Sequence, residues 1–208
     1  MPAAYAANED LEPLNAVFYD SGDARRSVAV VGSTILQDDD YYRGYRVVTF
    51  TPDAVIFKRQ EDGSGLNWPL NPENLNPSIH KLARHYFIVG QLRAVHLAQL
   101  QYEQQFKNGY AADIETLIRH GYLADGFESG VKQDYYFQMA DRPQEYGKEP
   151  TFLATASPVA AEEDYYFSVD QLGQVRYADT PSQMTWGPVW DYRHHSTNPA
   201  SRSIGLAQ

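Results

Sequence analysis

The chain of 208 residues contains no cysteine. This absence excludes disulfide bonds, thiolate metal sites and a cysteine nucleophile, but it suits a cytoplasmic protein and an exported protein stabilised by packing alone equally well. Long apolar runs are also missing, since no segment approaches the roughly 18 consecutive apolar residues that a membrane-spanning helix needs. The sequence itself therefore predicts no membrane-spanning helix.

Positive charge is scarce. The chain has 17 Lys and Arg against 27 Asp and Glu, which gives a formal net charge of -10. Such an average surface repels a phosphate backbone and anionic lipid headgroups, and no basic run offsets it. The adjacent Arg25 and Arg26 form only a pair. We therefore expect no nucleic-acid partner.

Motifs that identify common catalytic and metal sites are missing as well. Ser64 lies between two glycines without the flanking spacing of a nucleophile elbow. His80 and His85 are five residues apart, which places them on different faces of a helix, unlike the i, i+4 pair of a helical zinc site. The acidic run 38–40 offers calcium ligands but lacks the EF-hand spacing, and we interpret it as a solvated loop. We predict no catalytic residue, no metal site and no cofactor.

Aromatic residues are abundant, at 13% of the chain with 16 tyrosines. Tyrosine packs an apolar ring while its hydroxyl stays wet, so it suits half-buried strands and interfaces. In the first third of the chain, short apolar runs recur at roughly ten-residue spacing between turn residues, which predicts a small barrel or sandwich over residues 10–70. The expected strands are 14–19, 27–31, 34–36, 45–50, 54–59 and 66–70.

A different pattern follows the Pro- and Asn-rich segment 69–78, which we interpret as a linker. Pro77 suits a first helical turn and Asn76 its cap, so a helix is expected from Pro77 to about Lys107. Residues at three- and four-residue steps predict its buried stripe. They are Leu82, Tyr86, Val89, Arg93, Leu97 and Leu100, and the small residues Ala83, Ala94 and Ala98 widen the stripe.

The remainder predicts a second, shorter helix and a sheet. Asp113 suits the cap of a helix over 114–119. Apolar runs then predict four strands, at 135–140, 151–156, 165–169 and 175–177. Residues 191–208 continue a segment rich in Pro, Ser and Asn, and we predict a flexible tail there.

Several short motifs follow the long helix in a fixed order. They are Asn108-Gly109-Tyr110, Asp113 to Leu117, Gly121-Tyr122-Leu123, Tyr135-Tyr136-Phe137, Phe152 to Pro158 and Tyr165 to Asp170, with Gly173 at the end. The series resembles the globular domain of type IV pilins and type II secretion pseudopilins. The resemblance covers about residues 78–190 and implies a long N-terminal helix packed on a four-stranded antiparallel sheet over residues 76–190.

The front segment carries a second resemblance. The runs Val31 to Leu36 and Gly44 to Phe57 are similar to the small periplasmic β-domain of the type II secretion inner-membrane clamp protein, and to the pilus lipoprotein of that superfamily. Those domains bind the secretin or align inner- and outer-membrane parts by strand contacts. Because this β-rich module precedes the helix, we do not expect the protein itself to polymerise as a pilin.

Together these patterns predict an α+β protein with a β-rich module followed by a pilin-like module. The expected role is a non-enzymatic assembly or scaffold component of a type IV pilus or type II secretion-like apparatus, which binds protein partners. The expected location is the periplasm, with an inner-membrane anchor upstream of Met1. The alternative is a periplasmic ligand-binding or hydrolytic domain of unknown substrate. The aromatic residues predicted to contact a partner are Tyr41, Tyr42, Tyr45, Trp186 and Trp190.

Overall fold

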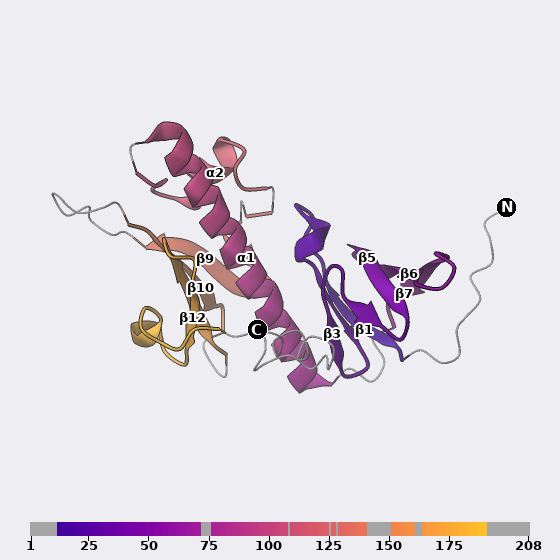
Figure 1. Ribbon diagram of the computed structural model, residues 1–208. Coiled ribbons are helices and arrows are strands. Elements are labelled where there is room, and N and C mark those ends of the chain that lie inside the picture. Colours follow the sequence, from indigo (N-terminus) through magenta and orange to yellow (C-terminus); the bar gives the residue numbers. More distant parts are fainter. Residues whose placement is uncertain are drawn as a thin grey trace, which may run out of the picture. The chain divides into compact units, whose positions relative to one another are not determined.

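A computed structural model shows an α+β protein with antiparallel sheets and one long helix (Figure 1). It describes residues 12–71, 76–107, 109–124, 126–127, 129–140, 151–160 and 164–190. Within these ranges the chain divides into two compact units, residues 12–87 and residues 88–190. The predicted flexible tail, 191–208, lies outside the described residues.

The division falls inside helix α1 (Pro77–Phe106), between Phe87 and Ile88. The sequence-based scheme instead began the second module at residue 76, at the proline-rich segment. The first turns of α1 are assigned to the front unit because they pack on its strands. The ring of Phe18 lies 4.8 Å from the ring of His80 and 6.3 Å from that of Phe87, measured between centroids.

The front unit contains two antiparallel sheets (Figure 1). The three-stranded sheet consists of β1 (Leu14–Phe18), β2 (Val28–Val31) and β3 (Thr34–Leu36), and the short 3-10 helix η1 (Ala24–Arg26) precedes β2. The four-stranded sheet consists of β4 (Tyr41–Tyr42), β5 (Tyr45–Thr51), β6 (Ala54–Arg59) and β7 (Gly65–Pro69). Most bounds lie within one residue of those predicted.

Both sheets contribute side chains to one hydrophobic core. Leu14 and Val31 come from the three-stranded sheet, and Val47 and Phe57 come from the four-stranded sheet. Each of these four side chains has no exposed surface. A core enclosed by two sheets is the packing of a sandwich, in which alternate residues of each strand point inward.

The rear unit contains residues 88–106 of α1, the short helix α2 (Ile114–Arg119) and one antiparallel sheet. The strand order is β12-β11-β10-β9-β8, with the 3-10 helix η2 (Pro181–Gln183) following β12. The strands are β8 (Val131–Lys132), β9 (Tyr135–Ala140), β10 (Leu153–Pro158), β11 (Tyr166–Asp170) and β12 (Val175–Ala178).

The sheet has five strands where four were predicted, because the sequence gives little sign of β8. This strand has two residues and joins β9 through Gln133 and Asp134, whose φ angles are 48° and 63°. Two consecutive positive φ angles are the mark of a type I′ hairpin turn, which Asn-Gly or Asp-Gly usually forms. Gln-Asp lacks that signal. The two-residue strand β4 was missed as well, although Gly44 lies in its turn.

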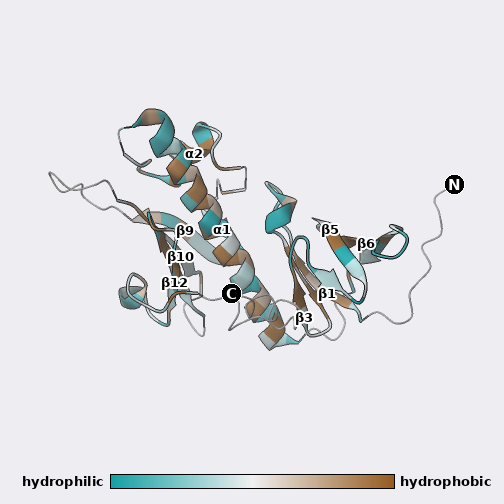
Figure 2. Ribbon diagram, viewed as in Figure 1, coloured by the Kyte–Doolittle hydropathy of each residue, from teal (hydrophilic) through white to brown (hydrophobic). Residues whose placement is uncertain are grey.

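The predicted buried stripe of α1 is correct in its first half, whereas in its second half only the small residues Ala94 and Ala98 are buried as predicted. Tyr86 and Val89 are buried, whereas Arg93 is exposed and Leu97 and Leu100 are 59% and 37% exposed. Figure 2 shows hydrophilic and hydrophobic residues interleaved along the whole helix. The buried positions of the second half are Gln91, Leu92, Ala94, Val95, Ala98 and Gln99.

Two glutamines explain why the buried face was misplaced. Gln91 and Gln99 have no exposed surface. Gln91 accepts a hydrogen bond from Lys132, and Gln99 is bonded to the backbone of Ala111. A buried amide is tolerated when it is hydrogen-bonded, so a search for apolar residues alone passes over it. No helix in the described part of the chain is long and apolar enough to cross a bilayer.

Candidate functional site

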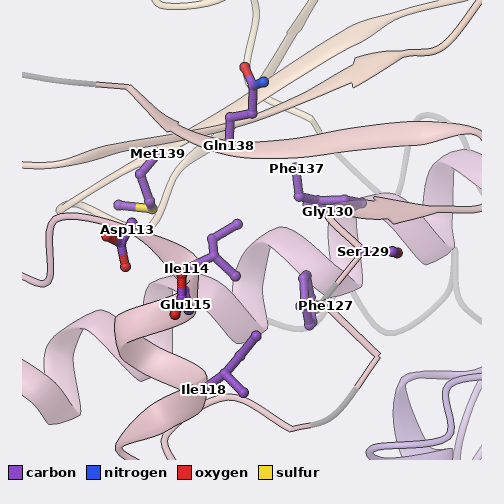
Figure 3. Close-up of a pocket in the computed structure, with 10 residues that line it drawn as sticks. All are labelled: Asp113, Ile114, Glu115, Ile118, Phe127, Ser129, Gly130, Phe137, Gln138 and Met139. Carbon is purple, nitrogen blue, oxygen red and sulfur yellow. The ribbon is translucent and has the colours of Figure 1, made fainter.

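A groove of about 670 Å³ opens in the rear unit between α2, the segment before β8, and β9 (Figure 3). Its lining combines an apolar floor with polar groups at the rim. The lining residues are Asp113, Ile114, Glu115, Ile118, Phe127, Ser129, Gly130, Phe137, Gln138 and Met139.

Helix α2 forms one wall of the groove, and a side-chain cap defines its start. Asp113 accepts a hydrogen bond from the backbone N–H of Thr116 at 2.7 Å, as an N-cap residue does. This bond holds the pKa of the Asp113 carboxyl below its usual value. The cap aligns the helix so that Ile114 is buried and Ile118 half-buried at the groove.

Two phenylalanine rings form the floor. Phe127 and Phe137 are nearly fully buried, and their ring centroids lie 5.4 Å apart at an interplanar angle of 85°. The ammonium group of Lys132 lies 3.9 Å from the centroid of Phe127, a cation–π contact, and donates a hydrogen bond to Gln91 at 3.0 Å. The floor is therefore tied to the short hairpin and to α1.

The opposite wall is an open edge of the sheet. Strand β8 pairs with Tyr135 and Tyr136 of β9, and the N–H of Phe137 donates to the carbonyl of Gly130 at 2.8 Å. The chain then leaves the edge at Gly130, which has a φ of +68° and donates its own N–H to the carbonyl of Phe127. Beyond Phe137, no strand in the described ranges pairs with this edge of β9.

Met139 carries the backbone groups at this open edge. The N–H and C=O of one strand residue point to the same side and alternate along the strand. Because Phe137 directs its N–H to Gly130, Met139 directs both groups to that same side, away from β10. The side chains of Phe137 and Met139 point toward α2, whereas that of Gln138 points away (Figure 3).

The two charged lining residues are acidic, and each is engaged by a partner within α2. The ten lining residues include two carboxylates, Asp113 and Glu115, and no basic side chain. Asp113 is engaged in the cap, and Glu115 accepts from Arg119 at 2.9 Å in an exposed ion pair. Within the described part of the chain, no group of three or more His, Cys, Asp or Glu could hold a metal ion.

The five aromatic residues predicted to contact a partner lie outside the groove. Some of them are exposed and others are buried. Tyr41 on β4 is 48% exposed and Trp186 is 67% exposed. Tyr42 and Tyr45 face each other across β4 and β5 inside the front core, where the Tyr45 hydroxyl accepts from Arg59 at 2.7 Å. The rings of Tyr42 and Tyr45 therefore pack in the core of the front unit.

The fifth of these residues, Trp190, is 3% exposed. Its backbone N–H donates to the carbonyl of Val175 at 2.7 Å, and its ring packs on Phe167 and Tyr177 at centroid distances of 5.5 and 5.4 Å. The segment that ends at Trp190 therefore covers the outer edge of β12. The contact role stays a prediction for Tyr41 and Trp186, while the other three rings stabilise cores.

Sequence reasoning did not find the groove. Helix α2 and β9 were predicted with the bounds they have, but nothing local indicates that β8 is too short to cover β9. Comparison of the chain with family models, curated proteins and solved structures finds no significant match. The resemblance to pilin-like domains therefore stays a prediction.

Proposed function

We propose that this chain is a non-enzymatic assembly protein of the bacterial envelope, which binds an extended segment of a partner protein at the open edge of β9. The observation that carries the proposal is the coincidence of two features. The backbone groups of Met139, which pair with no strand of the described ranges on this side, border an apolar groove formed by Ile114, Ile118 and Phe127.

Addition of a strand to a sheet edge is a common mode of peptide recognition. Main-chain hydrogen bonds supply affinity, and pockets for alternate side chains supply specificity. An exposed edge is also a hazard, because it pairs with unrelated chains unless it is short or covered. Here the outer edge of β12 is covered by the described residues up to Trp190, whereas no strand among the described residues pairs with β9 beyond Phe137. The contrast favours a functional edge at β9.

The order of elements supports membership in a pilus or secretion-like apparatus. A long helix, a short capped helix and an antiparallel sheet follow one another along the chain from Pro77, the order that the resemblance to pilin-like domains implies. In this proposal the rear unit is a pilin-like module and the front unit is an alignment module. The protein acts in the periplasm in this proposal.

The state of the carboxylates supports a role without catalysis. A general acid or base needs a group that is within reach of a substrate and titrates near the working pH. At the groove, Asp113 is held by its cap bond, which lowers its pKa, and Glu115 is paired with Arg119. Both carboxylates are therefore suited to recognition.

A proline at position 139 tests the proposal. Met139→Pro removes the outward N–H and places a ring on the edge, while the ladder to β10 keeps its bonds because Met139 contributes none to it. Met139→Ala is the matched control, since it loses the same side chain but keeps the N–H. The purified wild-type protein and both variants are used to capture partners from envelope extract, with folding checked by circular dichroism.

The expected result is a partner from a pilus or secretion apparatus that binds the wild type and Met139→Ala but not Met139→Pro. Equal capture by all three folded proteins would overturn the assignment of the β9 edge. A reproducible partner from outside such an apparatus would overturn the proposed role.

A further inference from the structure

We infer that Met139 is an oxidation site, at which a peroxide converts the thioether to a sulfoxide that the buried amide of Gln99 then holds. The inference goes beyond the proposed function and does not depend on it. It is carried by the position of the Met139 sulfur, by the bonding of Gln99, and by the contrast with Met184.

The side chain of Met139 is in contact both with the groove and with a buried polar group. The residue is half-buried and lines the groove, and its side chain points toward α2 (Figure 3). Its sulfur accepts a hydrogen bond from Nε2 of Gln99 on α1 at 3.7 Å. The groove therefore gives a small peroxide access to a methionine that already has a donor beside it.

Gln99 has one N–H group without a strong acceptor. Its amide carries two N–H donors and one oxygen, and the side chain has no exposed surface. Nε2 and the oxygen are bonded to the backbone of Ala111, at 2.9 and 2.8 Å. Within the described part of the chain, the second N–H has only the sulfur of Met139, and a thioether is a weak acceptor. A stronger acceptor at this point would therefore be stabilised.

Oxidation of the thioether supplies that acceptor. A sulfur lone pair attacks one oxygen of the peroxide, so that the S–O bond forms as the O–O bond breaks. Sulfur loses two electrons and the peroxide gains them. The proton of the transferred oxygen passes to the leaving oxygen, and the products are the sulfoxide and water, or an alcohol from an organic hydroperoxide. The methionine side chain is flexible, so its new polar oxygen can turn to the second N–H of Gln99.

Met184 lacks such a donor. It is half-buried as well, and its backbone oxygen accepts from the hydroxyl of Ser168 at 2.6 Å. No donor in the described ranges reaches its sulfur. A sulfoxide at Met184 replaces an apolar group by a polar one without gaining a hydrogen bond to the protein, whereas at Met139 it gains one. Oxidation should therefore cost less stability at Met139 than at Met184.

Two variants of the full chain separate the two sulfurs. Met184→Leu retains Met139, Met139→Leu retains Met184, and both share Met1. Each protein is treated with hydrogen peroxide, and mass spectrometry of its peptides locates the sulfoxide. Urea denaturation before and after treatment gives the equilibrium constant of unfolding. We expect oxidation to raise this constant about tenfold more in Met139→Leu than in Met184→Leu, the size of one hydrogen bond to a buried donor.

The side-chain amide of Gln99 is the direct reporter. In ¹⁵N-labelled Met184→Leu, one of its two proton resonances should move downfield on oxidation, because a sulfoxide oxygen replaces the thioether sulfur. The other proton, bonded to Ala111, should keep its position. In Met139→Leu, peroxide should leave both resonances unchanged.

Each outcome bears on the inference. Formation of the Met139 sulfoxide without a change in the Gln99 amide would overturn the assigned hydrogen bond. Equal losses of stability in the two variants would overturn the stabilised sulfoxide. If peroxide oxidises Met184 in the folded chain and leaves Met139 intact, Met139 is not an oxidation site.

Discussion

The side-chain amide of Gln99 is bonded to both backbone groups of Ala111. Its Nε2 donates to the Ala111 carbonyl at 2.9 Å, and its Oε1 accepts from the Ala111 N–H at 2.8 Å. Gln99 has no exposed surface and Ala111 is 4% exposed. These two hydrogen bonds attach the segment that precedes α2 to helix α1. They therefore help to position α2, which is one wall of the groove.

Replacement of Gln99 by Leu should therefore destabilise the protein. The change leaves the N–H and C=O of Ala111 buried without partners, at a cost of about 2–4 kcal/mol in the free energy of unfolding. Urea denaturation measures the loss. Gln101→Leu is the matched control, because Gln101 is exposed on the same helix and its replacement should change stability by less than about 0.5 kcal/mol. Equal effects of the two changes would contradict the bonding role of Gln99.

The cap of α2 gives a second prediction. Asp113→Ala should cost about 1 kcal/mol in the free energy of unfolding, because the N–H of Thr116 loses its acceptor. Asp113→Asn should preserve most of that stability at neutral pH. The lowered pKa of Asp113 belongs to the folded state, so its contribution is present above the ordinary value of 3.8 and is lost as pH falls through the lower folded value. If Asp113→Asn loses as much stability on acidification as the wild type, the Asp113 carboxylate is not the source of that loss.

His80 gives a prediction near neutral pH. Burial, and then the nearby Arg84, lower the pKa of His80 below its ordinary value of 6.5. The unfolded chain therefore binds the proton more readily, so this contribution to stability is complete above the unfolded pKa and is lost as pH falls below it.

The measurement is the free energy of unfolding at pH values above and below 6.5, the ordinary pKa of histidine. His80→Phe keeps a ring against Phe18 and should flatten the loss on acidification, whereas His120→Phe, at an exposed position, should retain it. If His80→Phe loses as much stability on acidification as the wild type, His80 is not the titrating group.

Gly187 gives a prediction about the covered edge of the sheet. A Cβ at this position would collide with the backbone carbonyl of Tyr177, so Gly187→Ala must displace the segment that ends at Trp190. We expect a loss of about 1–3 kcal/mol, the usual cost of overpacking, and a red shift of tryptophan emission as Trp190 becomes exposed. Gly65→Ala is the control, because no atom lies within 4 Å of its added Cβ. An unshifted emission maximum in Gly187→Ala would contradict the packing described.

Local patterns were sufficient for most elements. The predicted helix over 114–119 has those bounds, and the long helix begins at Pro77 with the Asn76 side chain accepting from Ser78, as expected. Caps and prolines act within a few residues, so the chain itself carries the information. Strand β8 was not predicted, because its turn is formed by Gln133 and Asp134 and contains no glycine.

By itself, the sequence determined where most helices and strands form, the acidic charge, and the mixed α+β class, because these depend on neighbours along the chain. Only the tertiary structure decided that Leu97 is exposed while Gln99 is buried, that Tyr45 and Trp190 are core residues, and that β9 keeps an open edge beside an apolar groove. The reason is that burial and pairing depend on groups brought together from distant parts of the chain, which hydrophobic periodicity alone does not encode.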